Sequence, residues 1–303
     1  MASMENRECT LCGPGAPKRE KYAANFSPED LNVAIFSARR QPDRRHFRLV
    51  ECDECGIIYS DPACTPDELA KLYEGSAVHY DDQEGQIYDS YAPVLDRALE
   101  RTALRGTFVE VGGGRGFMLR YGAEHGFREM VEVEPSADAE RRFEAPAANA
   151  RFLRGILEPG TLAPGSASLV CFFQMLDHLP DPMHFVRTVY DALEPGGVAV
   201  CVTHDTSAAT ARLLGELSPI FDIEHTYLFN RENLARLFEK AGFEGASTFP
   251  IANDYSLRYW LAMAPLPRAA KQIIAPVGRT RLGRVRLRAF MGNMGLIATR
   301  PAR

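Results

Sequence analysis

One short segment combines a carboxylate with closely spaced glycines: Glu110, Gly112, Gly113, Gly114 and Gly116. Glycine has no Cβ, so it lets the backbone approach a ligand closely and adopts positive φ in a tight turn. A dinucleotide site needs a G-x-G-x-x-G fingerprint, but Phe117 stands where its third glycine belongs. A carboxylate two residues before the first glycine suits a ligand with ammonium and sulfonium groups better than a pyrophosphate.

Four of the seven cysteines form two matched C-x-x-C pairs, each followed by glycine: Cys9 with Cys12 and Cys52 with Cys55. Such pairs commonly place four thiolates tetrahedrally around zinc, and a site closed by four thiolates is structural. Four unligated cysteines and a redox pair are the alternatives, and the presence of two copies favours zinc. Pairs this tight also suit metal better than disulfides in a reducing cytoplasm.

Three histidines fall where a ligand cleft is expected: His178, His204 and His225. Histidine titrates near neutral pH, so each is a candidate general base that removes a proton from a bound substrate. Glu224 directly precedes His225, and a nearby carboxylate would fix the imidazole tautomer or stabilise its charged form. The residues alone leave the choice among the three histidines open.

The span from Arg39 to Arg48 holds five arginines and one histidine, although the chain as a whole is acidic. Arginine forks bind phosphate or carboxylate with two hydrogen bonds, so one interpretation is recognition of an anionic substrate. The other interpretation is a solvated basic loop. Only Phe47 is interleaved among these arginines, which argues against a surface that stacks nucleic-acid bases.

Strands and helices that alternate along the chain would position these residues. Short β-branched or apolar runs predict strands, and helical periodicity with capping residues predicts helices. The predicted strands are 107–111, 130–133, 150–153, 169–174, 198–203, 243–250 and 294–299. The predicted helices are a short one that Thr65-Pro66 opens, 86–104, one that begins at Phe117, 136–144, one from the Asp181-Pro182 turn to Leu193, and 231–241. This order indicates a doubly wound, mostly parallel, Rossmann-like α/β sheet of seven strands, with ligands at the carboxyl ends of the strands.

Length and composition bound the organisation of the chain. With 303 residues, we expect a zinc-binding module with the arginine-rich excursion over residues 1–74 and the α/β domain, whose family resemblance is given below, over residues 75–303. A net charge of −5 argues against bulk binding to nucleic acid or to an anionic membrane. The longest apolar stretch, Leu169 to Leu176, is too short to span a bilayer, and the polar start of the chain lacks a signal-peptide core. We therefore expect a cytoplasmic protein with no membrane partner.

Several motifs resemble those of class I S-adenosylmethionine-dependent methyltransferases: the glycine turn, VEVEPS, QMLDHLPDP and LEPGGVAV. The resemblance covers roughly residues 75–300 and implies that the glycine turn binds S-adenosylmethionine. It places Glu134 on the ribose hydroxyls and adds Gln174 and Leu157 to the cofactor site. Gly155-Ile156-Leu157 stands where many relatives carry an acid that contacts the adenine amine. Apolar packing, backbone groups or Glu158 would then hold the adenine.

The cysteine pairs and Glu224-His225 resemble the zinc-containing sugar C-methyltransferases, which act on nucleotide-linked ketosugars. This resemblance implies methyl transfer to a small anionic metabolite and favours His225 as the base, assisted by Glu224, ahead of His178 and His204. An RNA methyltransferase is the alternative enzyme, but the segment from Gln174 to Asp177 lacks the N-P-P-Y type of motif that grips a flipped base. A non-catalytic binding protein is the third hypothesis. The segment 255–267 would form a substrate lid, a homodimer contact or a helix packed on the core.

Overall fold

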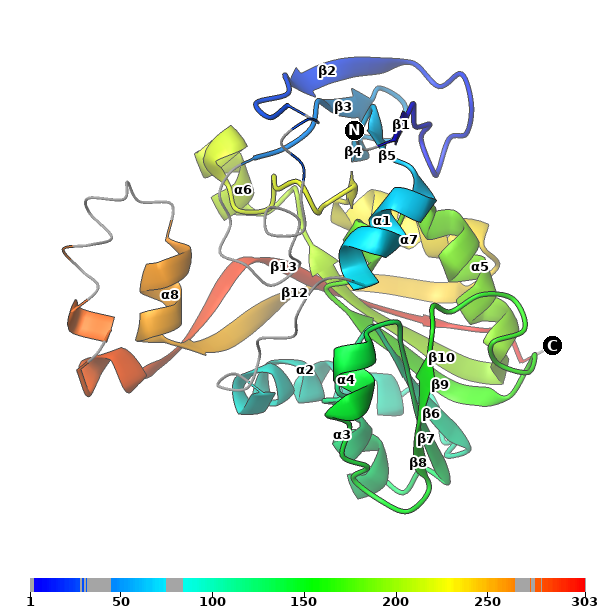
Figure 1. Cartoon of the computed structure of the whole chain (residues 1–303). Coiled ribbons are helices and arrows are strands. Elements are labelled where there is room, and N and C mark those ends of the chain that lie inside the picture. The colour runs from blue at the N-terminus through cyan, green and yellow to red at the C-terminus, as the bar shows by residue number, and fades with distance from the viewer. Residues whose placement is uncertain are drawn as a thin grey trace.

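The structure of the chain is a computed structural model, and it describes residues 3–27, 29, 31, 45–74, 84–264, 273, 276–278 and 280–302 (Figure 1). A seven-stranded sheet with the order β12-β13-β10-β9-β6-β7-β8 forms its centre. In chain order its strands are β6 (Thr107–Val111), β7 (Glu129–Glu134), β8 (Ala150–Arg154), β9 (Ala167–Phe173), β10 (Leu193–His204), β12 (Glu244–Ser256) and β13 (Arg286–Thr299). Strands β6 to β10 are parallel, whereas β13 runs antiparallel to both β10 and β12. The predicted mostly parallel, seven-stranded α/β sheet is confirmed.

Successive side chains of the central strands point to opposite faces of the sheet, and helices cover both faces. On one face, Phe108 and Leu169 pack with α2 (Glu84–Leu99) and α3 (Leu119–Glu124). On the other face, their neighbours Val109 and Val170 pack with α5 (Pro182–Ala192) and α7 (Arg231–Lys240). Because both faces are buried, these strands are mainly apolar in the sequence.

Capping residues set the starts of several helices. The Asp181 carboxylate accepts a hydrogen bond from the His184 N–H at 3.0 Å, with Pro182 as the first residue of α5. This cap starts α5 where the Asp181-Pro182 turn predicts it, and a separate short helix, η2 (Leu176–His178), precedes it. Ser136 caps α4 (Ala137–Arg141), which ends three residues before its predicted end.

A smaller four-stranded sheet lies above the central one, with the order β11-β4-β3-β2 (Figure 1). Its strands are β2 (Lys18–Tyr22), β3 (Leu49–Cys52), β4 (Ile58–Ser60) and β11 (Tyr227–Leu228). A short pair, β1 (Met4–Glu5) and β5 (Ala63–Cys64), precedes α1 (Pro66–Glu74). The predicted boundary at residue 74 falls at the end of α1 and stays a prediction. Strand β11, which lies far from the other three strands in the sequence, completes this sheet by pairing with β4.

Hydrogen bonds also join the N-terminal segment to the helices of the main sheet. Lys240 Nζ donates to the Leu11 carbonyl at 2.5 Å, and Asn233 Nδ2 donates to the Cys55 carbonyl at 3.2 Å. Leu11 belongs to the same buried apolar cluster as the strands and helices beside α7. The N-terminal segment therefore shares a continuous core with the main sheet.

Strands β12 and β13 continue past the sheet as a two-stranded ribbon that carries α8 (Leu257–Met263) (Figure 1). Their pairing extends from Asn253 opposite Ala289 to Ser256 opposite Arg286. The sequence predicted shorter strands here, because a ribbon away from the core needs no apolar alternation. Short helices complete the fold: α6 (Ala209–Leu214), η3 (Gly215–Leu217) and η4 (Leu282–Arg284). Within the described residues, every helix is too short or too polar to cross a bilayer.

We expect Phe172→Ala to lower the free energy of unfolding by about 3–5 kcal/mol, because it leaves a large cavity in the core. Phe172 is fully buried, and its ring centroid lies 5.0 Å from that of Phe185 and 6.3 Å from that of Phe238. Phe290→Ala is the matched control, since Phe290 is 66% exposed on the ribbon. Urea unfolding that gives equal losses for both variants would contradict this packing.

Candidate active site

A cavity of about 1640 Å³ opens at the carboxyl ends of the parallel strands. Its wall includes the residue that ends or follows each of five neighbouring strands: Gly112 after β6, Glu134 at the end of β7, Gly155 after β8, Gln174 after β9 and His204 at the end of β10. Ligands bind at this edge in open α/β sheets, as the sequence predicts. Residues of α8 and the ribbon form the far wall.

The glycine turn has a backbone that other residues adopt only with strain. The φ angles are +71° at Gly112, +66° at Gly114 and +77° at Gly116. At Gly113 the constraint is space, because an added Cβ would lie 2.3 Å from the Glu110 carboxyl carbon. The turn therefore requires glycine at 112, 114 and 116 for conformation and at 113 for close approach.

Two buried glutamates on neighbouring strands hold this turn. Glu110 Oε2 accepts a hydrogen bond from the Met118 N–H at 2.8 Å, and Glu132 Oε1 accepts one from the Gly113 N–H at 2.9 Å. Burial raises the pKa of Glu110 to about 7. Burial, and then the charge of Glu110, raise the pKa of Glu132 well above its usual range. Sequence reasoning missed Glu132, whose only signal is a second acid inside the apolar strand that ends at Glu134.

Glu134, predicted to hold the ribose hydroxyls, lies at the cavity wall. Its Oε2 accepts a hydrogen bond from the Gly114 N–H at 3.1 Å, and its Oε1 accepts one from the Ser136 N–H at 3.0 Å. A carboxylate offers about four acceptor positions, so each oxygen retains a lone pair for a hydroxyl group. The two backbone bonds fix the carboxylate in place, and this geometry fits a ribose diol.

The other predicted cofactor residues also line the cavity. Leu157 is buried there, and Gln174 has a φ of +53°, which is unusual for a residue other than glycine. Glu158, the alternative partner for adenine, lies at the rim and contacts His184 Nε2 through its carboxylate at 3.0 Å. Of the partners that the sequence predicts for the adenine, apolar packing therefore has a matching feature in the cavity wall, the buried Leu157.

The three candidate histidines surround one fully buried carboxylate, that of Asp177. His204 Nδ1 lies 2.5 Å from Asp177 Oδ2, and His225 Nε2 lies 3.9 Å from the same oxygen. His178 Nε2 lies 3.8 Å from Asp177 Oδ1. The His225 ring centroid lies 5.0 Å from that of His178 and 4.5 Å from that of His204. Glu224, predicted to assist His225, also lines the cavity.

Burial and the neighbouring charges shift the pKa values of Asp177 and His225. Burial favours a neutral Asp177, but the nearby imidazoles outweigh it and hold the pKa of Asp177 well below its usual range. Burial, and then the charge of His204, lower the pKa of His225 to about 3. These pKa shifts favour a neutral imidazole at His225 and an ionised carboxylate at Asp177. Sequence reasoning missed Asp177 as a functional residue, although it directly precedes His178.

The histidine cluster lies next to the glycine turn. A Cβ added at Gly112 would lie 2.8 Å from Met175 Cγ, so the turn after β9 packs directly on the turn after β6. The Thr226 N–H donates to the Asp177 carbonyl at 2.8 Å, which fixes the loop of His225 against the same turn. The predicted cofactor residues other than Gly114 and Gly116 thus line the same cavity as the candidate catalytic residues.

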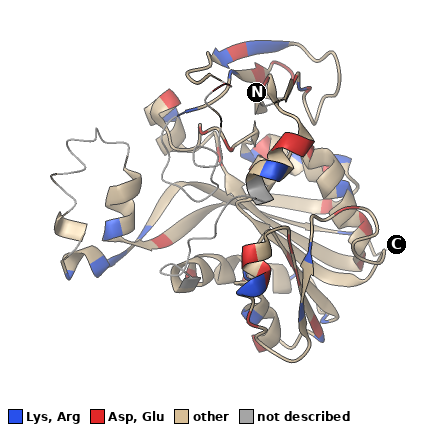
Figure 2. Ribbon diagram, in the orientation of Figure 1, with Lys and Arg blue, Asp and Glu red and all other residues tan. Residues whose placement is uncertain are grey.

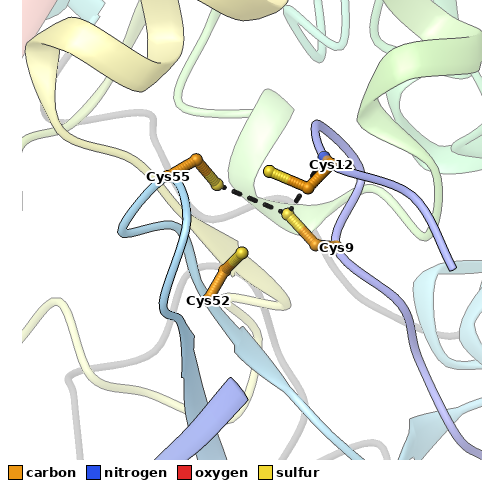
Figure 3. A group of neighbouring side chains, drawn as sticks. All are labelled: Cys9, Cys12, Cys52 and Cys55. Carbon is orange, nitrogen blue, oxygen red and sulfur yellow. Dashed lines mark hydrogen bonds between the residues drawn. The ribbon is translucent and has the colours of Figure 1, made fainter. Parts of the chain in front are cut away.

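The four paired cysteines meet away from this cavity (Figure 3). Their sulfur atoms all lie within 4.8 Å of one another, and the Cys9 and Cys55 sulfurs are 3.4 Å apart. The hydrogen bond from Cys55 lowers the pKa of Cys9 to about 5, whereas burial raises the pKa of Cys12 to about 12. Tetrahedral zinc with bonds of about 2.3 Å needs sulfurs about 3.8 Å apart. The four thiols fit such a site.

Only part of the arginine-rich span is described, because Arg39, Arg40 and Arg44 lie outside the described residues. Within it, Arg48 Nη2 lies 2.9 Å from the Asp61 carboxylate, and the buried His46 contacts Glu216 at 3.1 Å. These two residues make internal contacts. Basic residues also gather near η4 and the start of β13 (Figure 2). The basic residues of the cavity wall are Arg258, Arg284 and Arg286.

The chain belongs to a family of methyltransferase domains, whose pattern matches residues 83–248. The match begins in front of α2, includes the glycine turn and the histidine-bearing turn after β9, and ends within β12. The resemblance to methyltransferases that the sequence motifs indicated is confirmed at the level of the family.

Relatives of this chain carry the same description. An uncharacterized methyltransferase of Mycobacterium sp. strain JLS is 32% identical over 172 residues, which are 56% of this chain and 61% of that protein. A Mycolicibacterium smegmatis protein, named a probable S-adenosylmethionine-dependent methyltransferase, is 28% identical over 58% of this chain and 66% of its own length. The chain thus spans less than two thirds of the length of these relatives.

A solved structure supports the fold. A chain from the complex that contains the Haloferax volcanii Trm112 methyltransferase activator is similar, with a TM-score of 0.50 and 18% identity. The similarity covers 73% of this chain and 94% of that one. At this identity the likeness concerns the fold alone.

The buried glutamate pair gives a prediction about pH. As pH rises from 4.5 to about 7, unfolded glutamates release protons that the folded pair retains, so wild-type stability should fall. Glu132→Gln stays neutral and keeps an amide oxygen for the Gly113 N–H. Its stability relative to wild type should therefore rise with pH across this range, because the variant loses the buried acid whose pKa the fold raises.

Thermal unfolding at a series of pH values measures this difference. Glu129→Gln is the matched control, because Glu129 lies on the same strand with an exposed side chain. Parallel pH profiles for wild type and Glu132→Gln would show that the pair does not retain a proton in the folded protein.

Proposed function

We propose that the protein transfers the methyl group of S-adenosylmethionine to a small-molecule acceptor. The observation that carries this proposal is the hydrogen bond that joins the positive-φ glycine turn to Glu134 at the cavity wall. The turn lets the cofactor approach the backbone, and Glu134 offers one free lone pair on each oxygen to the ribose hydroxyls. Membership of the methyltransferase domain family supports the same cofactor.

The acceptor that we propose is an anionic metabolite such as a nucleotide-linked sugar. Arg258 and Arg284 line the cavity wall opposite the glycine turn, where guanidinium groups would bind phosphate. The cavity volume of about 1640 Å³ suits a cofactor together with a substrate of this size. An RNA methyltransferase and a non-catalytic binding protein remain the alternatives, and neither has a comparable feature in its favour.

Methyl transfer is an in-line displacement, in which the acceptor attacks the methyl carbon and sulfur leaves with the electron pair. The protein contributes mainly by aligning the two reactants in a site that excludes water. We place activation of the acceptor at the histidine cluster beside the glycine turn. His225 with Glu224 is the first choice there, and His178 and His204 are the others, because all four line the cavity.

We also propose that Cys9, Cys12, Cys52 and Cys55 bind one structural zinc ion. The closeness of the four sulfurs and the presence of two C-x-x-C pairs support it. Bound zinc would stabilise the thiolates and fix the N-terminal loop to the β3–β4 hairpin. Four cysteine ligands leave no open position for substrate, so its role would be structural.

Further predictions concern partners and location. A homodimer would explain the apolar side chains that the ribbon exposes, such as Phe290 and Leu282, which are 66% and 57% exposed. The thiols of the paired cysteines suit a reducing compartment, which supports the cytoplasm. Both inferences stay predictions.

The function is tested with S-adenosylmethionine that carries a radiolabelled methyl group. We expect label to enter small anionic metabolites of a cell extract, with nucleotide sugars as defined substrates, and not purified RNA. Gly114→Val is the inactive control, because a β-branched residue at a φ of +66° is strained and would also block the cofactor. Transfer to RNA would favour the alternative enzyme, and absence of both transfer and cofactor binding would refute the proposal.

Metal removal tests the cysteine site. We expect the double variant Cys9→Ser/Cys12→Ser to lose one equivalent of zinc per chain and to unfold at a lower temperature, because zinc binding contributes to folding free energy. Cys64→Ser is the control, since Cys64 is a buried cysteine outside the cluster. Equal zinc content in the two variants by elemental analysis would contradict the site.

A further inference from the structure

The hydrogen bond of His225 to the backbone fixes which of its ring nitrogens carries a proton. His225 Nδ1 lies 2.7 Å from the Ile220 carbonyl oxygen, which can only accept, so Nδ1 is the donor. Nε2 is therefore the ring nitrogen whose lone pair is available to a metal ion. That lone pair lies 3.9 Å from Asp177 Oδ2, which is also an acceptor. Two acceptors that share a buried space require a cation or a proton between them.

One of the two carboxylate oxygens of Asp177 has no hydrogen-bond donor among the described residues. Its Oδ2 is bonded to His204, but its fully buried Oδ1 accepts no hydrogen bond from the described residues. A buried carboxylate oxygen without a donor costs free energy unless a positive charge lies close to it. His178 Nε2 lies 3.8 Å from this oxygen, on the side that faces the cavity. The carboxylate and two imidazoles thus converge on one point.

We infer that Asp177, His178 and His225 bind a divalent first-row transition-metal ion at the wall of the active-site cavity. Their ligand atoms all lie within 4.8 Å of one another, and His178 Nε2 and His225 Nε2 lie 3.8 Å from Oδ1 and 3.9 Å from Oδ2 of the Asp177 carboxylate. Two imidazoles and one carboxylate are a donor set that such ions prefer, whereas magnesium and calcium prefer oxygen alone. The set occupies three positions and leaves others open toward the cavity.

His204 acts on this site through Asp177. The bond between His204 Nδ1 and Asp177 Oδ2 orients the carboxylate and leaves Oδ1 free to face the ion. Partners of this kind commonly orient ligands in metal sites, and their loss typically weakens metal affinity by about 10–100-fold. His204 is therefore a positioning residue for the metal.

This inference rests on the proposed function in one respect, because it gives the ion a task in methyl transfer. A cation here would attract an acceptor that has an oxygen anion and would hold it beside the glycine turn. His225 would then be a metal ligand and not the base that removes the proton. The metal site itself is independent of the reaction and can be measured without cofactor or acceptor.

Cobalt(II) is the probe, counted by elemental analysis after equilibrium dialysis of the full chain freed of loosely bound metal by a chelator. We expect the wild type to bind one more equivalent of cobalt than His178→Ala and His225→Ala bind. His204→Ala should bind the same amount with an affinity about 10–100-fold lower. His184→Ala is the matched control, since His184 lies at the cavity rim outside the cluster and should bind as the wild type does.

Comparing variants removes the contribution of the cysteine site, which all of them share. Circular dichroism checks that each variant is folded. If the alanine variants are unfolded, His178→Gln replaces them as the test, because glutamine keeps the side-chain volume without offering a strong metal ligand. Equal cobalt binding by wild type, His178→Gln and the folded alanine variants would overturn the site. Cobalt binding without any methyl transfer would uphold the site and refute the proposed function. Methyl transfer by a protein that binds no extra cobalt would uphold the proposed function and refute the metal site.

Discussion

Hydrogen bonds from the glycine turn to buried carboxylates are the constraint on which the site depends. The N–H groups of Gly113 and Gly114 donate hydrogen bonds to the carboxylates of Glu132 and Glu134, two acids on the neighbouring strand. A backbone turn at a sheet edge would otherwise leave these donors to water or to a ligand. Because the acids lie two residues apart on one strand, the register between β6 and β7 sets the shape of the turn. The proposed cofactor site thus depends on the pairing of these two strands.

The sequence predicted the sheet because its signals are local. Buried parallel strands are continuous apolar runs, and caps such as Asp181 mark helix starts within a few residues. The ribbon could not be predicted, since its pairing needs no apolar periodicity. The role of Asp177 was equally hidden, because only folding brings His204 and His225 to the residue beside His178. Contacts between residues far apart in the chain carry no local signal.

The pairing of β11 with β4 connects the cysteine cluster to the active site. Tyr227 of β11 lies opposite Tyr59 of β4 and donates a hydrogen bond to the Glu8 carbonyl, next to Cys9. His225 stands only two residues before this strand. The N-terminal segment therefore holds in place the loop that carries His225. A metal ion at the cysteines would add stability to that loop without touching the substrate, which gives the N-terminal segment a structural role in the site.

Trp260 is the only tryptophan of the chain, and it lies on α8 at the cavity wall. Its indole N–H donates to the Leu287 carbonyl at 2.9 Å, which ties α8 to the ribbon strand β13. The rings of Tyr255 and Tyr259 lie 5.6 Å and 5.8 Å from it. Since no second indole contributes a background signal, the tryptophan fluorescence of the protein comes from one known position at the cavity wall. The fluorescence of Trp260 is therefore a signal with which ligand binding in the cavity can be followed.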